Sequence, residues 1–326
     1  MEQISQIIDR FSGLKVMVIG DLMIDAYTWG KVSRISPEAP VPVVNVTKKE
    51  SRLGGAGNVV LNVASLGAEP IVCSVVGDDA AGLELFAMLR AQGLSVDGLM
   101  TELGRSTTVK ERVIAGSQQL LRIDSETEQA ISSESKNKLF AYIATQLAKV
   151  DIVIFEDYDK GVLSEDLIQS VIQLAKSLSI PTVVDPKKKN FFAYAGATLF
   201  KPNLHELRDG LQVHQSRFDA EHIAQTVADF KASQQFEGLF LTLSERGVYL
   251  DFKMEQVSIP AHIRQIADVS GAGDTVISIA ACALAAGANA YQLAALANLG
   301  GGLVCESLGV VPIDKEHLRK EALANL

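Results

Sequence analysis

Short apolar runs alternate with segments of helical periodicity through most of this sequence, and this alternation is what most restricts its fold. The pattern predicts strands at 15–19, 71–76, 151–156, 182–185, 198–201 and 239–243, and helices at 80–92, 133–149, 164–178 and 220–231. Strands that alternate with helices of this length build a mainly parallel sheet covered by helices on both faces. Two further runs, at 248–250 and 256–260, indicate a late antiparallel pair. With 326 residues, 48% of them hydrophobic, we expect a single α/β domain over 1–326.

In two stretches, at about 27–50 and 105–125, the sequence pattern predicts β-strands inserted into the α/β alternation. The first contains candidate strands at 27–30 and 41–46, and the second at 107–114 and 119–123, with Gly116-Ser117 as the hairpin turn. We expect the two insertions to pair into a small β-sheet that covers the active-site edge as a lid. Because such a sheet would expose an apolar face, a homodimer through the lid is also expected.

Charge and composition argue against several classes of protein. The net charge is −9 and the basic residues are scattered, so we expect no nucleic-acid partner. The three cysteines, Cys73, Cys282 and Cys305, lie in apolar surroundings and indicate buried, reduced thiols of a cytosolic protein. Residues 1–10 have helical spacing rather than signal-peptide character. The Ala-rich region 276–305 is interrupted by polar residues and glycines, which favours two buried helices over a membrane span.

A glycine-rich loop, Asp268-Val269-Ser270-Gly271-Ala272-Gly273-Asp274-Thr275, leads directly into the apolar run 276–286. The first N–H groups of a helix lack internal partners and, with the helix dipole, form an anion site. Asp274 would lie at the mouth of that site, where its carboxylate could take a proton from an attacking hydroxyl. The alternative is that Asp274 is only a favourable charge at the N-terminus of the helix.

Polar residues follow several of the predicted strands, and the carboxyl ends of parallel strands share one edge. Asp21 and Asp25 could bind sugar hydroxyls, although for Asp21 alone turn and capping chemistry is the favoured interpretation. Asn203 and Glu206 could order a hydrated divalent ion, or could form a helix capping box. The other strand-end clusters are 156–161, 185–187, 201–206 and 242–247. A second glycine-rich helix start, at 54–58, could bind a ligand through Gly54, Gly55 and Asn58, or could form only a tight turn that needs positive φ.

These residues together resemble the PfkB, or ribokinase-like, carbohydrate kinases over essentially the whole chain. The resemblance rests on Gly54-Gly55, the segment Asn203 to Glu206 and the loop 268–274. Val269 stands where the family usually has a residue with a hydroxyl group. The segments 20–27, 33–43, 157–161, 185–187 and 196–199 resemble the heptose 7-phosphate kinase branch more closely. Lys188 and Asn190 depart from that branch, in which glycine and aspartate are frequent. The implied fold is a three-layer α/β/α sandwich with a β-sheet lid.

The resemblance implies an activity and a role for each site residue. The activity is ATP- and Mg²⁺-dependent phosphorylation of the anomeric hydroxyl of D-glycero-β-D-manno-heptose 7-phosphate, in the cytoplasm, with a monovalent cation as a further candidate cofactor. Asp274 would be the base, and the N–H groups of Gly271, Ala272 and Gly273 would stabilise the transferred phosphoryl group. The substrate-binding candidates are Asp21, Asp25, Gly54, Gly55, Asn58 and Asp157, with Arg34, Lys110, Arg112 and Lys187 for the distal phosphate. The nucleotide candidates are Asn203, Glu206, Thr242, Ser244, Gly247 and Asn298, of which Glu206 would hold the metal through water.

Two other functions fit the same residues. Another sugar or nucleoside kinase of this family would share every nucleotide-binding feature and differ only in the cations that bind phosphate. A non-catalytic sugar or nucleotide sensor would bind without turnover, and the intact Gly-Ala-Gly-Asp sequence argues against it.

Overall fold

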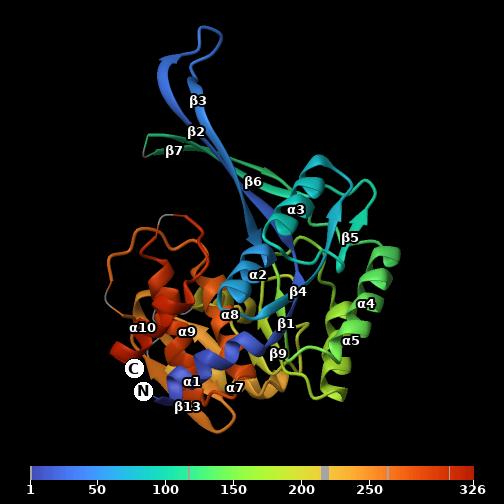
Figure 1. Ribbon diagram of the computed structural model, residues 1–326, viewed down its shortest axis with the longest axis vertical. Helices are drawn as coiled ribbons and strands as arrows, with labels where there is room; N and C mark the ends of the chain where they lie inside the picture. The colour runs from blue at the N-terminus through green and yellow to red at the C-terminus, as the bar shows by residue number, and fades with distance from the viewer. Residues whose placement is uncertain (1, 117, 214–219, 263, 308) are drawn as a thin grey trace.

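A nine-stranded sheet forms the centre of the molecule (Figure 1). The computed structural model describes residues 2–116, 118–213, 220–262, 264–307 and 309–326. The sheet order is β13-β12-β11-β10-β9-β8-β1-β4-β5. The strands are β1 (Lys15–Gly20), β4 (Glu69–Gly77), β5 (Leu99–Glu102), β8 (Ile152–Glu156), β9 (Thr182–Asp185), β10 (Leu199–Phe200), β11 (Gly238–Thr242), β12 (Val248–Phe252) and β13 (Glu255–Ile259). Neighbouring strands are parallel from β5 to β11, and β12 and β13 form the expected antiparallel pair.

Helices cover both faces of this sheet, so the predicted three-layer sandwich is confirmed. Alternate residues of β1 show the division, because Val16 and Val18 belong to one buried cluster while Met17 and Ile19 belong to the other. The first face is packed by α1 (Glu2–Arg10), α2 (Ala56–Ser65), α3 (Ala80–Ala91), α8 (Ala272–Ala285), α9 (Ala290–Val304) and α10 (Lys315–Asn325). The second is packed by α4 (Ser133–Leu147), α5 (Glu165–Ser177), α6 (Leu204–Leu211) and α7 (Ala220–Gln234).

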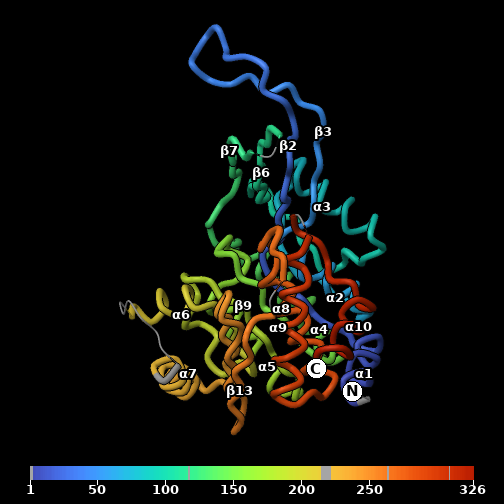
Figure 2. The backbone as a smooth tube through the Cα atoms, turned by 90° about the vertical axis from the view of Figure 1, so that its left-hand side faces the viewer, coloured from blue at the N-terminus to red at the C-terminus, as the bar shows by residue number. Residues whose placement is uncertain are grey.

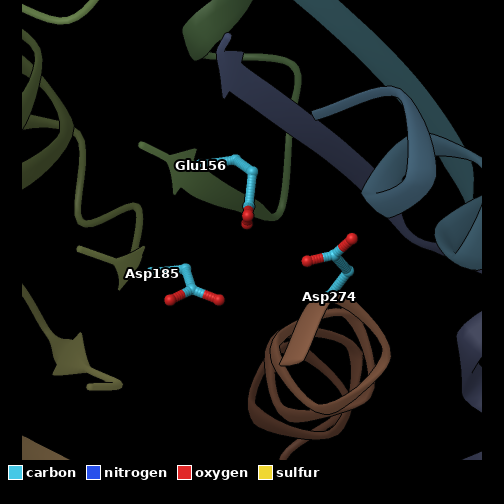
Figure 3. Close-up of side chains that lie close together, drawn as sticks. All are labelled: Glu156, Asp185 and Asp274. Atoms are coloured by element: carbon cyan, nitrogen blue, oxygen red, sulfur yellow. The ribbon is translucent and has the colours of Figure 1, made fainter. Parts of the chain in front are cut away.

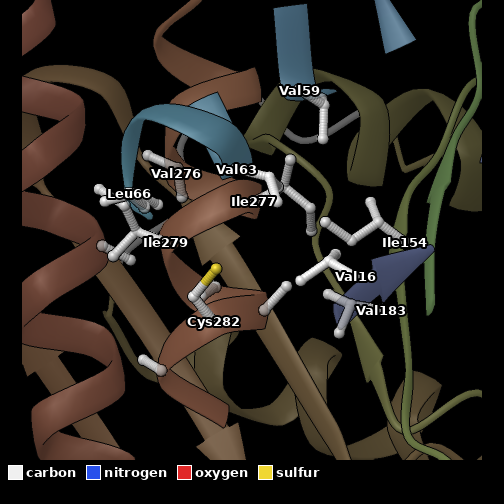
Figure 4. Packing of buried hydrophobic residues seen from close by; sticks show 14 of the residues in the cluster. Val16, Val59, Val63, Leu66, Ile154, Val183, Val276, Ile277, Ile279 and Cys282 are labelled. Atoms are coloured by element: carbon white, nitrogen blue, oxygen red, sulfur yellow. The ribbon is translucent and has the colours of Figure 1, made fainter. Parts of the chain in front are cut away.

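The Ala-rich region forms two buried helices, α8 and α9, as its composition predicts. Figure 4 shows α8 packed beside α2 and over the sheet, with Ile277 close to Val16 and Val63. Every residue of α8 from Asp274 to Ala283 is buried, which fixes the start of this helix firmly against the sheet. The structure contains no helix, among the described residues, that is long and apolar enough to cross a bilayer. Cys73 and Cys282 are buried as expected, whereas Cys305 is only partly buried.

A second, four-stranded sheet projects from the carboxyl edge of the large one, as Figures 1 and 2 show. Its order is β3-β2-β6-β7, from β2 (Leu22–Ile35), β3 (Pro42–Gly55), β6 (Thr108–Ala115) and β7 (Gln118–Ser125). The two insertions therefore pair through β2 and β6, as predicted for the lid. The predicted strands at 27–30 and 41–46 were too short, because β2 is central in this sheet and two neighbours continue its ladder. Of the expected turn Gly116-Ser117, the second residue lies outside the described part.

The order of the large sheet reverses between β1 and β8. From β1 the chain runs through the lid and α2 to β4 and β5 on one side, and later elements return to β8 and β9 on the other. Such a reversal leaves a crevice at the carboxyl ends of the strands, where ligands of open α/β sheets bind. The lid and the start of α8 both lie at this edge (Figure 1).

Candidate functional site

Three buried carboxylates meet at the carboxyl edge of the sheet. Glu156 and Asp185 are the last residues of β8 and β9, where they are paired in register, and Asp274 is in the first turn of α8. One oxygen from each lies within 4.8 Å of the others. Figure 3 shows the three side chains pointing into one common space. Because like charges so close together repel, this cluster needs protons or cations to balance it.

Asp274 is held by two neutral donors. Asn58 Nδ2 donates to one oxygen at 2.6 Å, and the Tyr158 hydroxyl donates to the other at 3.0 Å. Burial raises the pKa of Asp274 to about 6, and the charge of Asp185 adds to this, while the bonds from Asn58 and Tyr158 oppose it. A carboxylate with this pKa accepts protons readily near neutral pH. The arrangement therefore suits a general base.

Two lysines balance part of the negative charge. Lys201 lies 2.9 Å from Asp185 with its side chain only 3% exposed, and Lys187 pairs with Glu206. Burial alone lowers the pKa of Lys201, yet the charges of Asp185 and Glu206 raise it overall, so the lysine stays protonated. Burial, followed by the charges of Asp185 and Asp274, raises the pKa of Glu156 well above its ordinary value. One oxygen of Glu156 is buried without a hydrogen-bond partner among the described residues. An orphaned buried carboxylate oxygen of this kind fits a hard divalent cation.

The glycine-rich loop forms the predicted helix start. Gly271 caps α8 with φ +79°, and its carbonyl accepts the first helical bond from Thr275 at 3.0 Å. The N–H of Ala272 donates to Val269 O at 3.3 Å, so in this structure that amide has a partner within the loop. The part that Gly271, Ala272 and Gly273 would take in stabilising an oxyanion stays a prediction.

Gly271→Ala is expected to lower the free energy of unfolding by about 1–3 kcal/mol, because its backbone is left-handed. A Cβ there would also lie 2.9 Å from Asn58 Nδ2, so the donor that holds Asp274 would shift and activity would fall. Denaturant unfolding and kcat measure the two effects. Gly273→Ala is the matched control for stability, because its Cβ would meet nothing closer than 3.8 Å. Equal stability losses in the two variants would contradict the prediction.

A cleft of about 700 Å³ lies beside the loop, between α6, the β11–β12 turn and α9. Its lining includes Gly273 together with five of the six nucleotide candidates, namely Asn203, Thr242, Ser244, Gly247 and Asn298. The structure therefore brings these residues together, although they are far apart in sequence. Asn298 also donates to Pro260 O at 2.9 Å, the neighbouring-turn bond that an asparagine in a buried helix commonly makes.

Glu206 is not among the residues that line this cleft. Asn203 and Glu206 form a capping box at the start of α6, with both bonds 2.8 Å long. The second oxygen of Glu206 accepts from Lys187, so both oxygens of this carboxylate have protein partners. The structural alternative that the sequence left open is thus observed. Glu156 and Asp185 are better placed than Glu206 to contact a cation directly.

Asp21 and Asp157, two of the substrate-binding candidates, both have hydrogen-bond partners within the protein. The Asp21 carboxylate accepts backbone N–H bonds from Tyr158, Lys160 and Val162 and so shapes the loop after β8. Asp157 is 1% exposed and accepts from Asn190 and Tyr194. Exchanging these bonds for bonds to a sugar would cost free energy, because buried polar groups are stabilised by their partners. A substrate contact from either residue stays a prediction.

The other sugar candidates lie where the lid meets α2. Gly54 leaves space for Asp25, since a Cβ on Gly54 would lie 2.3 Å from an Asp25 oxygen. Gly55 caps α2 with a positive φ of 56°, which is the turn role that was the alternative to ligand contact. Asn58 contacts Asp274 rather than open space. A contact between a sugar and any of these residues stays a prediction.

The four candidate phosphate-binding cations do not form one group. Arg112 pairs with Asp25 at 2.6 Å, and Lys110 pairs with Asp124 and Glu126 on neighbouring parts of the lid. Arg34 lies in the exposed outer part of β2. Lys187 pairs with Glu206 next to the acidic cluster, and so it lies apart from the candidate cations on the lid.

Sequence reasoning gave no role to Glu156, Asp185, Tyr158 or Lys201, although all four stood in strand-end clusters. Their positions at strand ends could have identified them as site residues. Glu156 and Asp185 are the last residues of adjacent parallel strands, and Lys201 follows the next strand in the sheet. Sequence alone did not show that Asp185 and Glu156 would be in register.

Comparison with known proteins gives one consistent result. Residues 14–316 match the pfkB family carbohydrate kinases. The chain is 39% identical over 325 residues to the bifunctional protein HldE of Syntrophotalea carbinolica, covering 99% of this chain and 65% of that protein. It is 41% identical over 315 residues to the bifunctional protein HldE of Desulfatibacillum aliphaticivorans, covering 96% and 64%. The chain thus spans about two thirds of the length of these relatives.

Solved structures share the fold. Phosphofructokinase-2 from Escherichia coli in complex with potassium superposes with a TM-score of 0.78 at 17% identity, covering 96% of this chain and 100% of that one. Arabidopsis thaliana ribokinase complexed with ribose and ATP gives 0.73 at 18% identity, covering 94% and 98%. The chain thus has the ribokinase-like fold, and it belongs to the pfkB family of carbohydrate kinases.

Proposed function

We propose that this chain transfers the γ-phosphoryl group of ATP to the anomeric hydroxyl of D-glycero-β-D-manno-heptose 7-phosphate. The observation that carries the proposal is the position of Asp274, a buried carboxylate at the start of α8. It follows Gly273, which lines the large cleft, and is bonded to Asn58 in the first turn of α2, next to the base of the lid. Identity of about 40% to the HldE proteins, together with the heptose-kinase motifs, supports heptose 7-phosphate as the acceptor. A cytoplasmic location is proposed with it.

Asp274 would remove the proton of the acceptor hydroxyl as that oxygen attacks the γ-phosphorus. Asn58 and Tyr158 orient the carboxylate, and each leaves lone pairs of the oxygens open toward the acceptor. The amides of Gly271 and Gly273 and the dipole of α8 would stabilise the negative charge on the transferred phosphoryl group. Each such donor is worth on the order of 3 kcal/mol in the barrier.

The family implies Mg²⁺, and the residues present fit it. Glu156 and Asp185 would hold the ion, since Glu156 has a buried oxygen without a protein partner and both are hard oxygen ligands. When bound, the ion supplies charge neutralisation for the phosphate oxygens. Asp274, already bonded to Asn58 and Tyr158, is left to accept the proton. A monovalent cation stays a prediction.

The pH dependence of kcat/KM should show an acid limb near pH 6, because burial raises the pKa of Asp274 to about 6 and the protonated form cannot accept a proton. Below that pH the rate should fall about tenfold per unit. Tyr158→Phe removes a bond that favours the charged carboxylate, so the limb should move to higher pH. If the acid limb came instead from titration of ATP or of the sugar phosphate, its pH would be the same in Tyr158→Phe as in the wild type.

The substrate is tested by measuring ADP release with purified protein and a panel of acceptors. Heptose 7-phosphate should react with the highest kcat/KM, ahead of fructose 6-phosphate, ribose, nucleosides and the unphosphorylated heptose. A preference for another sugar or a nucleoside would assign a different reaction within the same family. Nucleotide binding without turnover on any acceptor would support a sensor.

We further propose that two copies associate through the lid. Leu121 and Ile123 of β7 are 55% and 44% exposed, and they pair in register with Val113 and Glu111, on the sheet face opposite to Tyr27 and Arg112. Exposed apolar residues on a thin sheet favour burial against a partner. Sedimentation should show a dimer for the wild type and a monomer for Leu121→Lys with Ile123→Lys. A wild-type monomer at micromolar concentration would contradict the proposal.

A further inference from the structure

Two arginines on the lid lie against one aromatic ring. Tyr27 is on the central strand β2, and the guanidinium carbons of Arg52 and Arg112, from the neighbouring strands β3 and β6, lie 5.2 and 5.4 Å from its ring centroid. Tyr27 is only 8% exposed, whereas the Arg52 and Arg112 side chains are 29% and 23% exposed. The ring is thus covered by two guanidiniums that still reach solvent.

Each guanidinium is fixed by an acid that engages only part of its donor set. Arg112 Nη1 donates to Asp25 at 2.6 Å, and Arg52 Nε donates to Glu50 at 2.6 Å. Glu50 is also bound by Lys48 at 2.5 Å, so its charge is shared. An arginine offers five N–H donors. The Nη2 groups of both arginines form no hydrogen bond to any residue that the structure describes, and remain available for a ligand.

Arg52 also connects the lid to the phosphoryl-transfer loop. Its Nη1 donates to Val310 O at 3.2 Å, and a Cβ on Gly271 would lie 3.1 Å from the Val310 side chain. A single residue therefore separates this lid arginine from the loop that caps α8. Asp25, one of the sugar candidates, lies opposite Arg52 in the register of β2 and β3. Asp25 therefore shares one face of the lid sheet with Tyr27, Arg52 and Arg112, and Arg52 also reaches toward the loop.

We infer that Arg52 and Arg112, held on Tyr27, form the subsite for the phosphate monoester of the acceptor, at the end away from the reacting hydroxyl. The inference depends on the proposed function and adds Arg52, which the sequence did not single out. Planar guanidiniums bind phosphate oxygens through paired N–H donors, and stacking on Tyr27 prepares their orientation before binding. Preference for a phosphorylated over an unphosphorylated sugar would be set here.

Arg52→Ala is the decisive variant, because removal of Arg112 would also free the buried Asp25. We expect kcat/KM for heptose 7-phosphate to fall about 10- to 100-fold, mainly through KM, as for loss of hydrogen bonds to a charged group. The rate with unphosphorylated heptose should change less than about threefold. Arg52→Lys should recover part of the loss, since it keeps the charge without the fork. Arg122→Ala is the matched control, being on the same sheet face one strand farther from Tyr27.

A second readout does not require turnover. Trp29 is the single tryptophan and is stacked on Tyr27 with ring centroids 6.3 Å apart, so its fluorescence should report occupation of the subsite. Titration with fructose 6-phosphate should change the emission of the wild type and of Arg122→Ala, while fructose should not. Arg52→Ala should lose this response.

The outcomes separate the two proposals. If the variant keeps the full preference for phosphorylated acceptors, or if fructose alters Trp29 as fructose 6-phosphate does, the subsite is wrong and the kinase assignment stands. If no acceptor is phosphorylated while Trp29 still responds through Arg52 to sugar phosphates, the subsite stands and the proposed reaction is wrong.

Discussion

Asp274→Asn is expected to reduce kcat about 10²- to 10⁴-fold, the range that a positioned general base contributes. Asparagine has nearly the same shape and can keep a bond from Tyr158, but its amide accepts a proton far less readily. ATP should still bind, because the cleft lined by Ser244, Gly247 and Asn298 is unchanged. Single-turnover phosphoryl transfer and equilibrium binding of an ATP analogue measure the two properties separately.

Asp268→Asn is the matched control from the same loop. The Asp268 carboxylate accepts backbone N–H bonds from Ser270 at 2.9 Å and Gly309 at 3.0 Å, and takes no part in the cluster of Figure 3. This variant should lose stability through weaker charge-assisted bonds while kcat stays within about tenfold of the wild type. A kcat for Asp274→Asn within that same range would remove Asp274 from the role of base.

The large sheet was predictable because its strands are continuous apolar runs, as strands buried on both faces must be. β8, β9 and β11 deviate by at most one residue from the predicted ranges. The lid strands were harder, because the outer parts of β2 and β3 are exposed and carry mixed polar residues. These outer parts pair only with each other, whereas residues 23–30 of β2 also pair with β6, a partner some eighty residues away that local sequence does not specify.

The site was predictable at the glycine-rich helix start and along the cleft, because both depend on local chemistry at the ends of elements. It was not predictable where a polar side chain could bond either to the loops at the edge of the large sheet or to the lid. Asp21 and Asp25 are close in sequence, yet Asp21 binds the loop after β8 and Asp25 binds Arg112 on the lid. The cluster of Glu156, Asp185 and Asp274 arises from strand register and from packing of α8, neither of which can be read from one segment.

Lys201→Met should lower the free energy of unfolding by about 3–5 kcal/mol near pH 8, the range for removing one partner of a buried ion pair. Lys201 is 2.9 Å from Asp185 and its side chain is 3% exposed, so no water replaces the lost charge. Methionine fills a similar volume, which limits the cavity contribution. Lys187→Met is the control, because Lys187 is 32% exposed and its loss should be much smaller.

The loss should shrink as the pH falls toward 5. Burial and the charges of Asp185 and Asp274 already raise the pKa of Glu156, and removal of Lys201 raises it further. A carboxyl whose folded pKa is raised takes up a proton in the native state before the unfolded chain does, so protonation relieves the repulsion selectively in the folded protein. Mg²⁺ should stabilise Lys201→Met more than the wild type, since the ion would replace the missing charge beside Glu156 and Asp185. Urea unfolding at pH 5 and pH 8, with and without Mg²⁺, measures each effect. A stability loss that is the same at both pH values would show that the carboxylate cluster is already neutralised by bound protons, and that its charge is not what Lys201 balances.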